Sequence, residues 1–329
     1  MKRIPLTIAT SDYDHIRDFR DGTVTAVGLD PTWLTMEIHE IFTRFTIDRE
    51  WEVSELSFAK FIAQVTRDEP DIIGIPVWTS RQFRFSSFYT NVNSGIREAK
   101  DFTGKRIAVP EWAQTAAVYT RGWLQHGAGV DLTSIQWVQA GTEQPGRGEK
   151  VELNLPDGIE IERVTDKSIS EMLASGEIDG ALVARVPKVF AAGHPDVKRL
   201  FPSYREMEEL YYDETGIFPI MHVIALRKDV LEDNPWIARN LYNAFLEAKE
   251  RAMARFLEIG VSRYCLPWAV DHAERMMKKF DGDIFPYGIE ANRETLEAFC
   301  QFAFEQGIAH SHAKPEDLFA KGVDLDVRI

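Results

Sequence analysis

Residues 168–187 read SISEMLASGEIDGALVARVP, a helical pattern that runs directly into a strand. The helix is predicted to end near Gly176, because glycine readily adopts the left-handed conformation that closes many helices. The apolar run GALVA (180–184) then predicts a strand. A helix that leads straight into a strand is typical of α/β proteins with mainly parallel sheets.

The same alternation continues in both directions from this stretch. Strands are predicted at 4–10, 51–57, 72–78, 85–91, 106–110 and 217–227, and helices at 37–45, 58–65, 115–126, 234–257, 268–280 and 291–306. A chain of 329 residues is long enough for two lobes. Because no low-complexity linker is present, we expect the lobes to be joined by short crossovers.

The composition limits the classes of partner. A formal net charge of −14 argues against general affinity for nucleic acid or anionic membranes, so an anionic ligand has to be met by locally placed arginines. No apolar run approaches the ~18 residues of a membrane span. The N-terminal MKRIPLTIATSDYD lacks the apolar core of a secretory leader, which leads us to expect a cytoplasmic protein.

Common metal and nucleotide motifs are missing from the sequence. Cys265 and Cys300 have no CxxC spacing, and we expect both to be buried as small apolar side chains. His310 and His312 form an H-x-H that we interpret as part of a solvated tail. Without a G-x-G-x-x-G or Walker sequence a nucleotide cofactor is not expected, and we predict neither a metal nor any other cofactor.

The stretch SRQFRFSSFY (80–89) places Arg81 and Arg84 directly after the apolar strand IIGIPVW (72–78). Ligands of two-lobed α/β proteins bind where strands end. Guanidiniums there are suited to bidentate binding of carboxylates. The alternative is that both arginines form surface ion pairs of little energetic value.

Several longer strings carry a family resemblance. DFTGKRIAVP (101–110) and ISEMLASGEIDGALV (169–183) resemble the second-lobe sequences of type II periplasmic-binding-protein-like folds. The chain also resembles the 4,5-dihydroxyphthalate decarboxylase family over nearly its whole length. The strings that carry this resemblance are SELSFAKF (54–61), IPVWTSRQFRFSSFY (75–89), VPEWAQTAAVYTRGWLQ (109–125), TGIFPIMHVIALR (215–227) and FPYGIEANRETLEAF (285–299).

The resemblance implies a two-lobed α/β fold with a ligand cleft between the lobes. Lobe one would comprise residues 1–86 and 217–329, and lobe two residues 87–216. The implied activity is removal of one carboxylate from 4,5-dihydroxyphthalate, or a related hydroxylated aromatic acid, giving protocatechuate and CO2. A ring hydroxyl para to the departing group can supply electron density, so no cofactor is obligatory.

Candidate catalytic residues are His222, Glu55 and Glu111. Histidine can give and take a proton near neutral pH, whereas a lone histidine in an apolar strand is more often a core residue; only the family string favours catalysis. A glutamate in a closed site can act as an acid or press against the leaving carboxylate. Glu55 could instead cap the helix that follows it, and which glutamate has which role stays open.

Candidate substrate-binding residues lie at the other strand ends. Arg81, Arg84 and Arg185 would bind carboxylates from both lobes. The remaining candidates are Ser54, Ser57, Thr115 and Tyr287, of which Tyr287 could stack on an aromatic ring, although core packing is the usual role of such a residue. The expected partner is a small aromatic carboxylate, with homo-oligomerisation left open.

Two other functions fit the same fold. A solute-binding protein for an aromatic carboxylate would use the same cleft, but that class normally carries a secretory leader. A related enzyme acting on a pyrimidine or another heteroaromatic ring would be favoured by phosphate-binding glycines and a histidine-rich motif, and the sequence shows neither.

Overall fold

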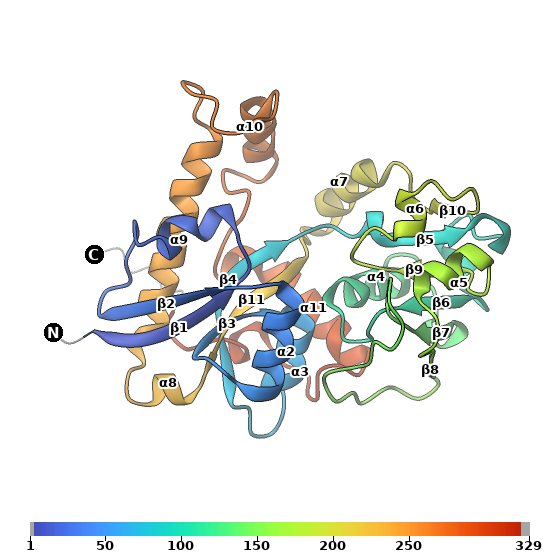
Figure 1. Ribbon diagram of the computed structural model, residues 1–329, viewed down its shortest axis with the longest axis horizontal. Helices are drawn as coiled ribbons and strands as arrows, with labels where there is room; N and C mark the ends of the chain where they lie inside the picture. The colour runs from blue at the N-terminus through green and yellow to red at the C-terminus, as the bar shows by residue number, and fades with distance from the viewer. Residues whose placement is uncertain (1–2, 324–329) are drawn as a thin grey trace.

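The computed structural model describes residues 3–323 and has two α/β lobes side by side (Figure 1). Each lobe is built on one mixed sheet. The first sheet has the order β2-β1-β3-β11-β4, with bounds Leu29–Thr35, Ile4–Thr10, Val53–Ser57, Ile220–Arg227 and Ile72–Arg81. The second has the order β10-β5-β9-β6-β7-β8, with bounds Val197–Arg199, Phe88–Asn91, Gly180–Leu182, Arg106–Val109, Gln136–Gln139 and Ile161–Arg163.

The helices flank these sheets. Those near the first sheet are α1 Arg17–Arg20, α2 Ile38–Asp48, α3 Phe58–Val65, α8 Asp229–Glu232, α9 Trp236–Phe256, α10 Ala269–Lys279 and α11 Arg293–Glu305. Those of the second lobe are α4 Thr115–His126, α5 Ile169–Ser175, α6 Lys188–Ala191 and α7 Tyr204–Thr215. As predicted, α5 ends at Gly176, which has a φ of 77°.

The chain passes between the lobes twice. It leaves the first sheet after β4 and returns after α7 to form β11, which pairs antiparallel with both β3 and β4. The other strand pairs of the first sheet are parallel. The α/β class is therefore as expected. The lobe limits stay a prediction, and their outermost residues 1–2 and 324–329 lie outside the described part of the chain.

Two local features differ from the sequence pattern. The strand predicted at 85–91 begins with a 3-10 turn, Phe85–Ser87, because the Glu208 carboxylate accepts hydrogen bonds from the backbone N–H groups of Phe85 and Ser86. These two N–H groups therefore cannot pair with a neighbouring strand, and β5 begins only at Phe88. Strand β2 was not predicted, since its sequence LDPTWLT contains a proline and has little alternation.

Behind the cleft the two lobes share a hydrophobic core. Helix α11 packs against α3 of the first lobe and α4 of the second, and buried residues of both lobes form one continuous cluster. Gly122 of α4 makes this approach possible, because a Cβ at this position would lie 2.3 Å from the Phe302 ring. The lobes are thus packed together as well as linked through the chain.

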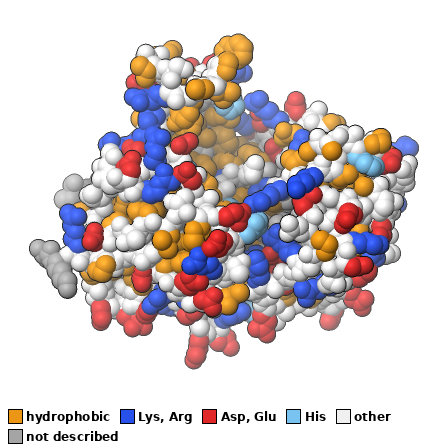
Figure 2. All heavy atoms as spheres, viewed as in Figure 1, with side chains coloured by type: hydrophobic (Ala, Val, Ile, Leu, Met, Phe, Trp, Pro, Cys, Tyr) orange, Lys and Arg blue, Asp and Glu red, His pale blue; other side chains and the backbone are white. Residues whose placement is uncertain are grey.

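The C-terminal end of α9 and helix α10 project from the first lobe as an arm (Figure 1), whereas α9 is packed in the core through buried residues from Ile237 to Ala252. The connection between them includes Cys265, which is exposed, so its predicted burial is wrong; Cys300 is buried on α11. Cys265 is exposed because the chain leaves the core at this point. No helix within residues 3–323 is long and apolar enough to cross a membrane. On the face shown in Figure 2, acidic and basic side chains are interspersed.

Candidate functional site

An irregularity in β11 turns His222 toward the cleft. His222 is aligned with Ser57 of β3 and Ser80 of β4, and the β11–β4 register shifts on both sides of it. Such bulges re-aim side chains and are frequent beside active sites. The imidazole is 19% exposed, and the edge-on ring of Phe42 lies 5.0 Å away and restricts its rotation.

The carboxylate of Glu55 is buried directly behind His222. Its Oε1 lies 2.9 Å from Nδ1 of His222 and accepts hydrogen bonds from the hydroxyls of Tyr13 at 2.6 Å and Thr79 at 2.9 Å. Its Oε2 accepts the backbone N–H of Ser11 at 2.8 Å. All of these contacts hold the carboxylate in one position. Of the two alternatives for Glu55, capping of the following helix is not seen, because both carboxylate oxygens are used here.

These contacts determine the charge of Glu55. Burial alone would raise the pKa of Glu55, but the hydrogen bond and charge of His222, together with the Ser11 and Tyr13 donors, hold the pKa below its ordinary value. Burial and the neighbouring Glu55 charge raise the pKa of Tyr13, which therefore stays a hydrogen-bond donor. An ionised carboxylate only accepts hydrogen bonds, so Nδ1 of His222 carries a proton. Nε2 has no hydrogen-bond partner among residues 3–323 and is left for a ligand.

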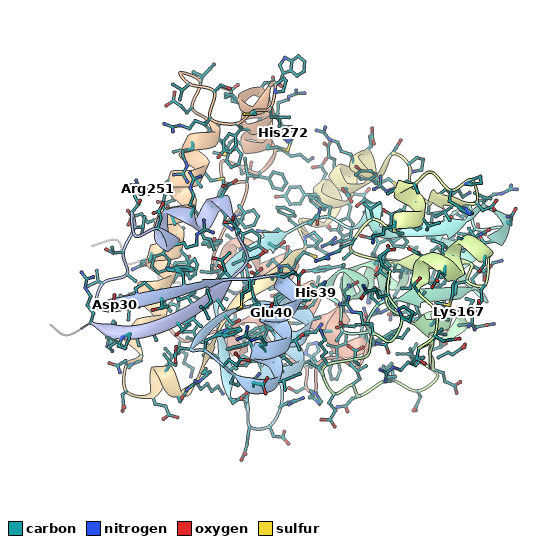
Figure 3. All side chains as sticks on the ribbon, in the orientation of Figure 1. Asp30, His39, Glu40, Lys167, Arg251 and His272 are labelled. Atoms are coloured by element: carbon teal, nitrogen blue, oxygen red, sulfur yellow. The ribbon has the colours of Figure 1, made fainter. Side chains whose placement is uncertain are left out.

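His222 opens onto a cavity of about 240 Å³ between the lobes. The first lobe contributes the start of α2, including His39, which Figure 3 places beside the second lobe. The second lobe contributes the start of α4 and the loop residues Arg147 and Arg185. A ligand in this cavity would contact both lobes at once.

Arg84 lies in the wall of this cavity, on the segment that joins β4 to the second lobe. Its guanidinium contacts Sδ of Met221 at 3.0 Å and the carbonyl of Ala184 at 3.3 Å, and no carboxylate of the described residues forms an ion pair with it. Burial lowers the pKa of Arg84 to about 10, so it stays charged at neutral pH. A half-buried charge without a counterion is a suitable anchor for an anionic ligand.

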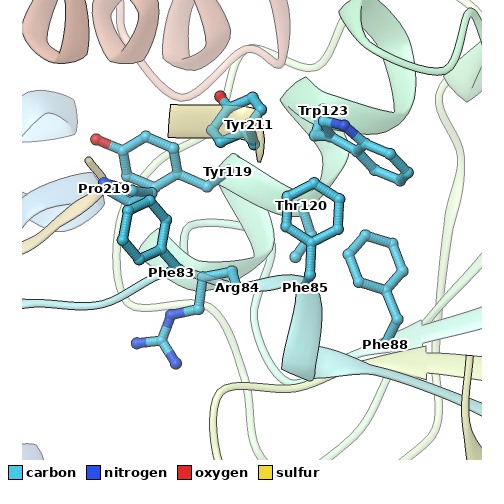
Figure 4. A pocket seen from close by; sticks show the side chains of 9 residues that line it. All are labelled: Phe83, Arg84, Phe85, Phe88, Tyr119, Thr120, Trp123, Tyr211 and Pro219. Carbon is cyan, nitrogen blue, oxygen red and sulfur yellow. The ribbon is translucent and has the colours of Figure 1, made fainter. Parts of the chain in front are cut away.

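On its other side, the backbone of Arg84 borders a small aromatic cavity of about 20 Å³. Figure 4 shows the Arg84 guanidinium pointing away from the rings of Phe85, Phe88 and Trp123 that line it. This space holds about one water molecule. It is therefore too small for an aromatic substrate, and the cleft cavity is the candidate site.

A buried cluster of charges supports the floor of the cleft. Glu111 is fully buried and pairs with Lys60 and with Nε of Arg147 at 2.7 Å, while Nζ of Lys150 lies 4.0 Å away. Burial alone would raise the pKa of Glu111, but these three cations outweigh it and lower the pKa. Glu111 is thus an ionised counter-charge that holds Lys60 and Arg147 at the cavity wall.

We expect Glu111→Gln to lower the free energy of unfolding by about 3 kcal/mol at pH 7, since removing one partner of a buried ion pair leaves the other charge uncompensated. Because the folded-state pKa of Glu111 is depressed, its contribution is present above the ordinary pKa of 4.5 and is lost as pH falls through the depressed value. Urea unfolding of the parent and of Glu111→Gln, at pH 7 and in steps below pH 4.5, measures the difference in the free energy of unfolding. A stability difference that stays constant or widens in acid would contradict it.

Neutral polar groups complete the cavity. Ser57 and Thr115 face each other across the lobes with their hydroxyl oxygens 2.9 Å apart. Oε1 of Gln114 is buried and has no donor among the described residues. Burial and the charge of Arg147 lower the pKa of His39 to about 4, so its imidazole is neutral at pH 7. These groups suit the hydroxyls of a ligand rather than its charges.

The structure brings part of the predicted set together. His222, Arg84, Arg185, Ser57 and Thr115 line the cavity, with Glu55 behind His222 and Glu111 behind the basic side chains. Arg185 is mostly exposed and pairs across the cleft with Glu37 at 2.9 Å. It therefore stands at the mouth of the site.

Three predicted residues lie elsewhere. Arg81 turns away from this cavity and donates hydrogen bonds to the carbonyls of Phe218 at 2.7 Å and Pro286 at 3.3 Å. The hydroxyl of Ser54 donates to the carbonyl of Glu55 at 2.9 Å. Tyr287 is buried beneath Lys249, whose Nζ lies 5.3 Å from the ring centre, so it packs in the core.

Sequence reasoning missed Lys60, Arg147 and the role of Tyr13. Lys60 could have been found, because it is the one charge in the apolar helix FAKFIAQV (58–65). Arg147 lies in an irregular loop and carries no such signal. Tyr13 follows the first strand, but its pairing with Glu55 depends on the sheet order.

The histidines near the C-terminus have structural contacts. The backbone N–H of His310 donates to the hydroxyl of Thr66, and its Nδ1 lies 3.0 Å from the side-chain nitrogen of Asn154. The interpretation of this segment as a solvated tail is therefore wrong for His310, although His312 is exposed. Within residues 3–323 no three His, Cys, Asp or Glu side chains are grouped so that they could hold a metal ion.

Comparison with solved structures agrees with this architecture. A periplasmic sulfonate-binding protein of Methylobacillus flagellatus superposes with a TM-score of 0.56 at 14% identity, covering 97% of this chain and 92% of its own. The periplasmic aliphatic sulphonate-binding protein of Escherichia coli superposes with a TM-score of 0.52 at 11% identity, covering 98% of this chain and 99% of its own. At these identities the likeness concerns the fold alone.

The sheets, the double crossover and the cleft define a two-lobed periplasmic-binding-protein-like protein of type II. No family model matches the sequence. A curated 4,5-dihydroxyphthalate decarboxylase of Comamonas testosteroni is 34% identical over 320 residues, which cover 97% of each chain. Another, from Pseudomonas putida, is 37% identical over 202 residues, 61% of this chain and 78% of its own. The chain belongs to the 4,5-dihydroxyphthalate decarboxylase family.

Proposed function

We propose that the protein is a decarboxylase that converts 4,5-dihydroxyphthalate, or a close hydroxylated aromatic acid, to its monocarboxylate and CO2. The observation that carries the proposal is the Glu55–His222 pair facing a cavity rich in cations. Family membership supports the same activity. In the overall reaction the ring gains one proton at the carbon that loses CO2.

His222 would supply that proton. With Nδ1–H held by Glu55, the imidazolium form presents Nε2–H to the cavity and transfers its proton to the ring carbon bearing the departing carboxylate. The hydroxyl para to this carbon releases its proton to solvent, giving a cyclohexadienone-like intermediate. Cleavage of the carbon–carboxylate bond then returns the electron pair to the ring, restores aromaticity and releases CO2. The oxygen and His222 each take up a proton from solvent, so the overall reaction consumes one proton.

The cations of the cleft would hold the substrate carboxylates. Arg84 can bind the retained carboxylate in bidentate fashion, because no protein carboxylate among residues 3–323 occupies its guanidinium. Lys60 and Arg147 lie in the same cavity but are already paired with Glu111, so they compensate the departing carboxylate only weakly. The departing carboxylate must become neutral CO2, so tight pairing of this group would oppose the reaction. It follows that Arg84 is best placed on the carboxylate that stays.

Neutral groups would orient the catechol hydroxyls. The buried Oε1 of Gln114 lacks a donor among the described residues, and a substrate hydroxyl can supply one. Ser57, Thr115 and the neutral His39 can accept or donate hydrogen bonds at the same site. Because the para hydroxyl supplies the electrons, the proposed reaction needs no organic electron sink.

The direct test is incubation of chelator-treated protein with 4,5-dihydroxyphthalate in D2O. We expect CO2 release and a ring product with one deuterium at the carbon that lost the carboxylate. Chromatography and mass spectrometry detect both. Tight binding without a product would instead support a solute-binding protein, and turnover that requires added metal would contradict cofactor independence.

We expect Arg84→Gln to lower kcat/KM by about 10- to 100-fold, mainly through KM, because a charge-assisted hydrogen bond is worth about 1.5–3 kcal/mol. Steady-state kinetics with 4,5-dihydroxyphthalate measures the effect. Arg97→Gln, an exposed arginine of the second lobe, is the control and should behave like the parent. An unchanged KM in Arg84→Gln would remove Arg84 from the substrate site.

A further inference from the structure

A second, larger cavity lies on the other side of the segment that joins β4 to the second lobe. Its volume is about 410 Å³, and it is lined by Arg81, Phe83 and Ser87, whereas Ser80 lines the catalytic cleft. Gln82, Arg84 and Ala184 line both spaces. The two cavities therefore adjoin along the joining segment.

Three guanidiniums face this second cavity without a carboxylate partner among residues 3–323. Arg81 bonds only to backbone carbonyls, and its Nε is buried without a hydrogen bond. Arg199 donates to the hydroxyl of Tyr89 at 3.3 Å, and Arg84 to a carbonyl and a thioether. In a chain with a net charge of −14, three such arginines around one space are unusual.

The walls of the second cavity are aromatic. The guanidinium of Arg81 lies 4.3 Å from the ring centre of Phe218, and that of Arg199 lies 5.0 Å from Tyr204 and 5.6 Å from Tyr89. These contacts orient the cations and leave hydrogen-bonding edges for a ligand. Flat rings beside guanidiniums suit an aromatic carboxylate better than a compact inorganic anion.

Glu208 is the acidic residue that lines this space. Its Oε1 accepts the backbone N–H groups of Phe85 and Ser86, and burial raises its pKa. One carboxylate faces three guanidiniums, so the cavity keeps an excess of positive charge even when Glu208 is ionised. A ligand carboxylate would balance it.

We propose that this second cavity is a regulatory site for a small aromatic carboxylate, separate from the catalytic cleft. A ligand there contacts Arg81 and Phe218 of the first lobe and Arg199 and Tyr204 of the second. Its affinity therefore depends on how the lobes are placed, and by linkage its binding shifts that placement. Arg84, shared by both cavities, couples the site to substrate binding.

Isothermal titration with phthalate tests the proposal. Phthalate has the two carboxylates and the ring but lacks the hydroxyls needed for turnover. Arg199→Gln removes a cation that lines the second cavity but not the catalytic cleft. Val186 is half-exposed at the opening of the second cavity, so Val186→Trp fills this opening without removing a hydrogen bond. Arg97→Gln, an exposed arginine of the same lobe, is the matched control.

We expect the parent and Arg97→Gln to bind one more equivalent of phthalate than Arg199→Gln and Val186→Trp. We also expect phthalate to inhibit the parent with a non-competitive component that both cavity variants lose. The number of bound phthalate molecules is measured without turnover. The regulatory site can therefore be disproved while the proposed reaction stands, and the reverse also holds. Equal stoichiometry in all four proteins would overturn the proposal.

Discussion

Replacing His222 with alanine should lower kcat by about 10³-fold and change KM little. General acid catalysis by a positioned side chain is worth about 10²- to 10⁴-fold, and in the proposed reaction Nε2 of His222 donates the proton to the substrate. Release of CO2 and formation of the monocarboxylate, followed in steady state, measure the loss.

The control for this variant is His126→Ala. His126 pairs with Glu305 on the protein surface and has no contact with the cleft, so its replacement should leave kcat unchanged. Circular dichroism and phthalate binding establish that His222→Ala is folded with an intact cleft. If the variant kept its kcat within tenfold of the parent, another group or a water molecule would be the proton donor.

Glu55→Gln should lower kcat by about 10²-fold at neutral pH. The change removes the negative charge that stabilises the imidazolium, and it places an amide N–H₂ among the donors of Ser11, Tyr13 and Thr79. Nδ1–H of His222 then loses the anionic acceptor that fixes the direction of Nε2. We therefore expect kcat to fall while KM stays close to that of the parent.

The split between kcat and KM separates this positioning role from a structural one. A variant that is merely less stable loses folded protein, which circular dichroism and phthalate binding detect. Glu162→Gln, at an exposed pair with Arg106, is the matched control and should keep the kcat and KM of the parent. A folded Glu55→Gln variant that kept the kcat of the parent would show that Glu55 does not act through His222.

Strand ends and family strings led from the sequence to His222, Arg84, Arg185, Ser57 and Thr115, which the structure places around one cavity. Their roles stay predictions: for His222 an apolar strand suggests a core histidine, and only the family string favoured catalysis. The physical reason for its exposure is the bulge in β11, which depends on pairing with a distant strand. No local pattern in IMHVIAL (220–226) predicts this bulge.

Arg81 shows where the strand-end argument failed. Arg81 and Arg84 were treated as a pair because both follow the same strand. Strand β4 ends at Arg81, so the direction of Arg84 is set by the irregular segment that follows and not by the strand pattern. The structure places Arg81 at the second cavity, while Arg84 reaches both.

The proposed proton-transfer pair and one wall of the cleft come from different lobes. Glu55, Tyr13 and His222 are all supplied by the first lobe, whereas Gln114, Arg147 and Arg185 are supplied by loops and a helix start of the second. Loops tolerate change far better than paired strands do. Changes in the second lobe can therefore alter which acids fit the cleft without touching the proposed proton-transfer pair.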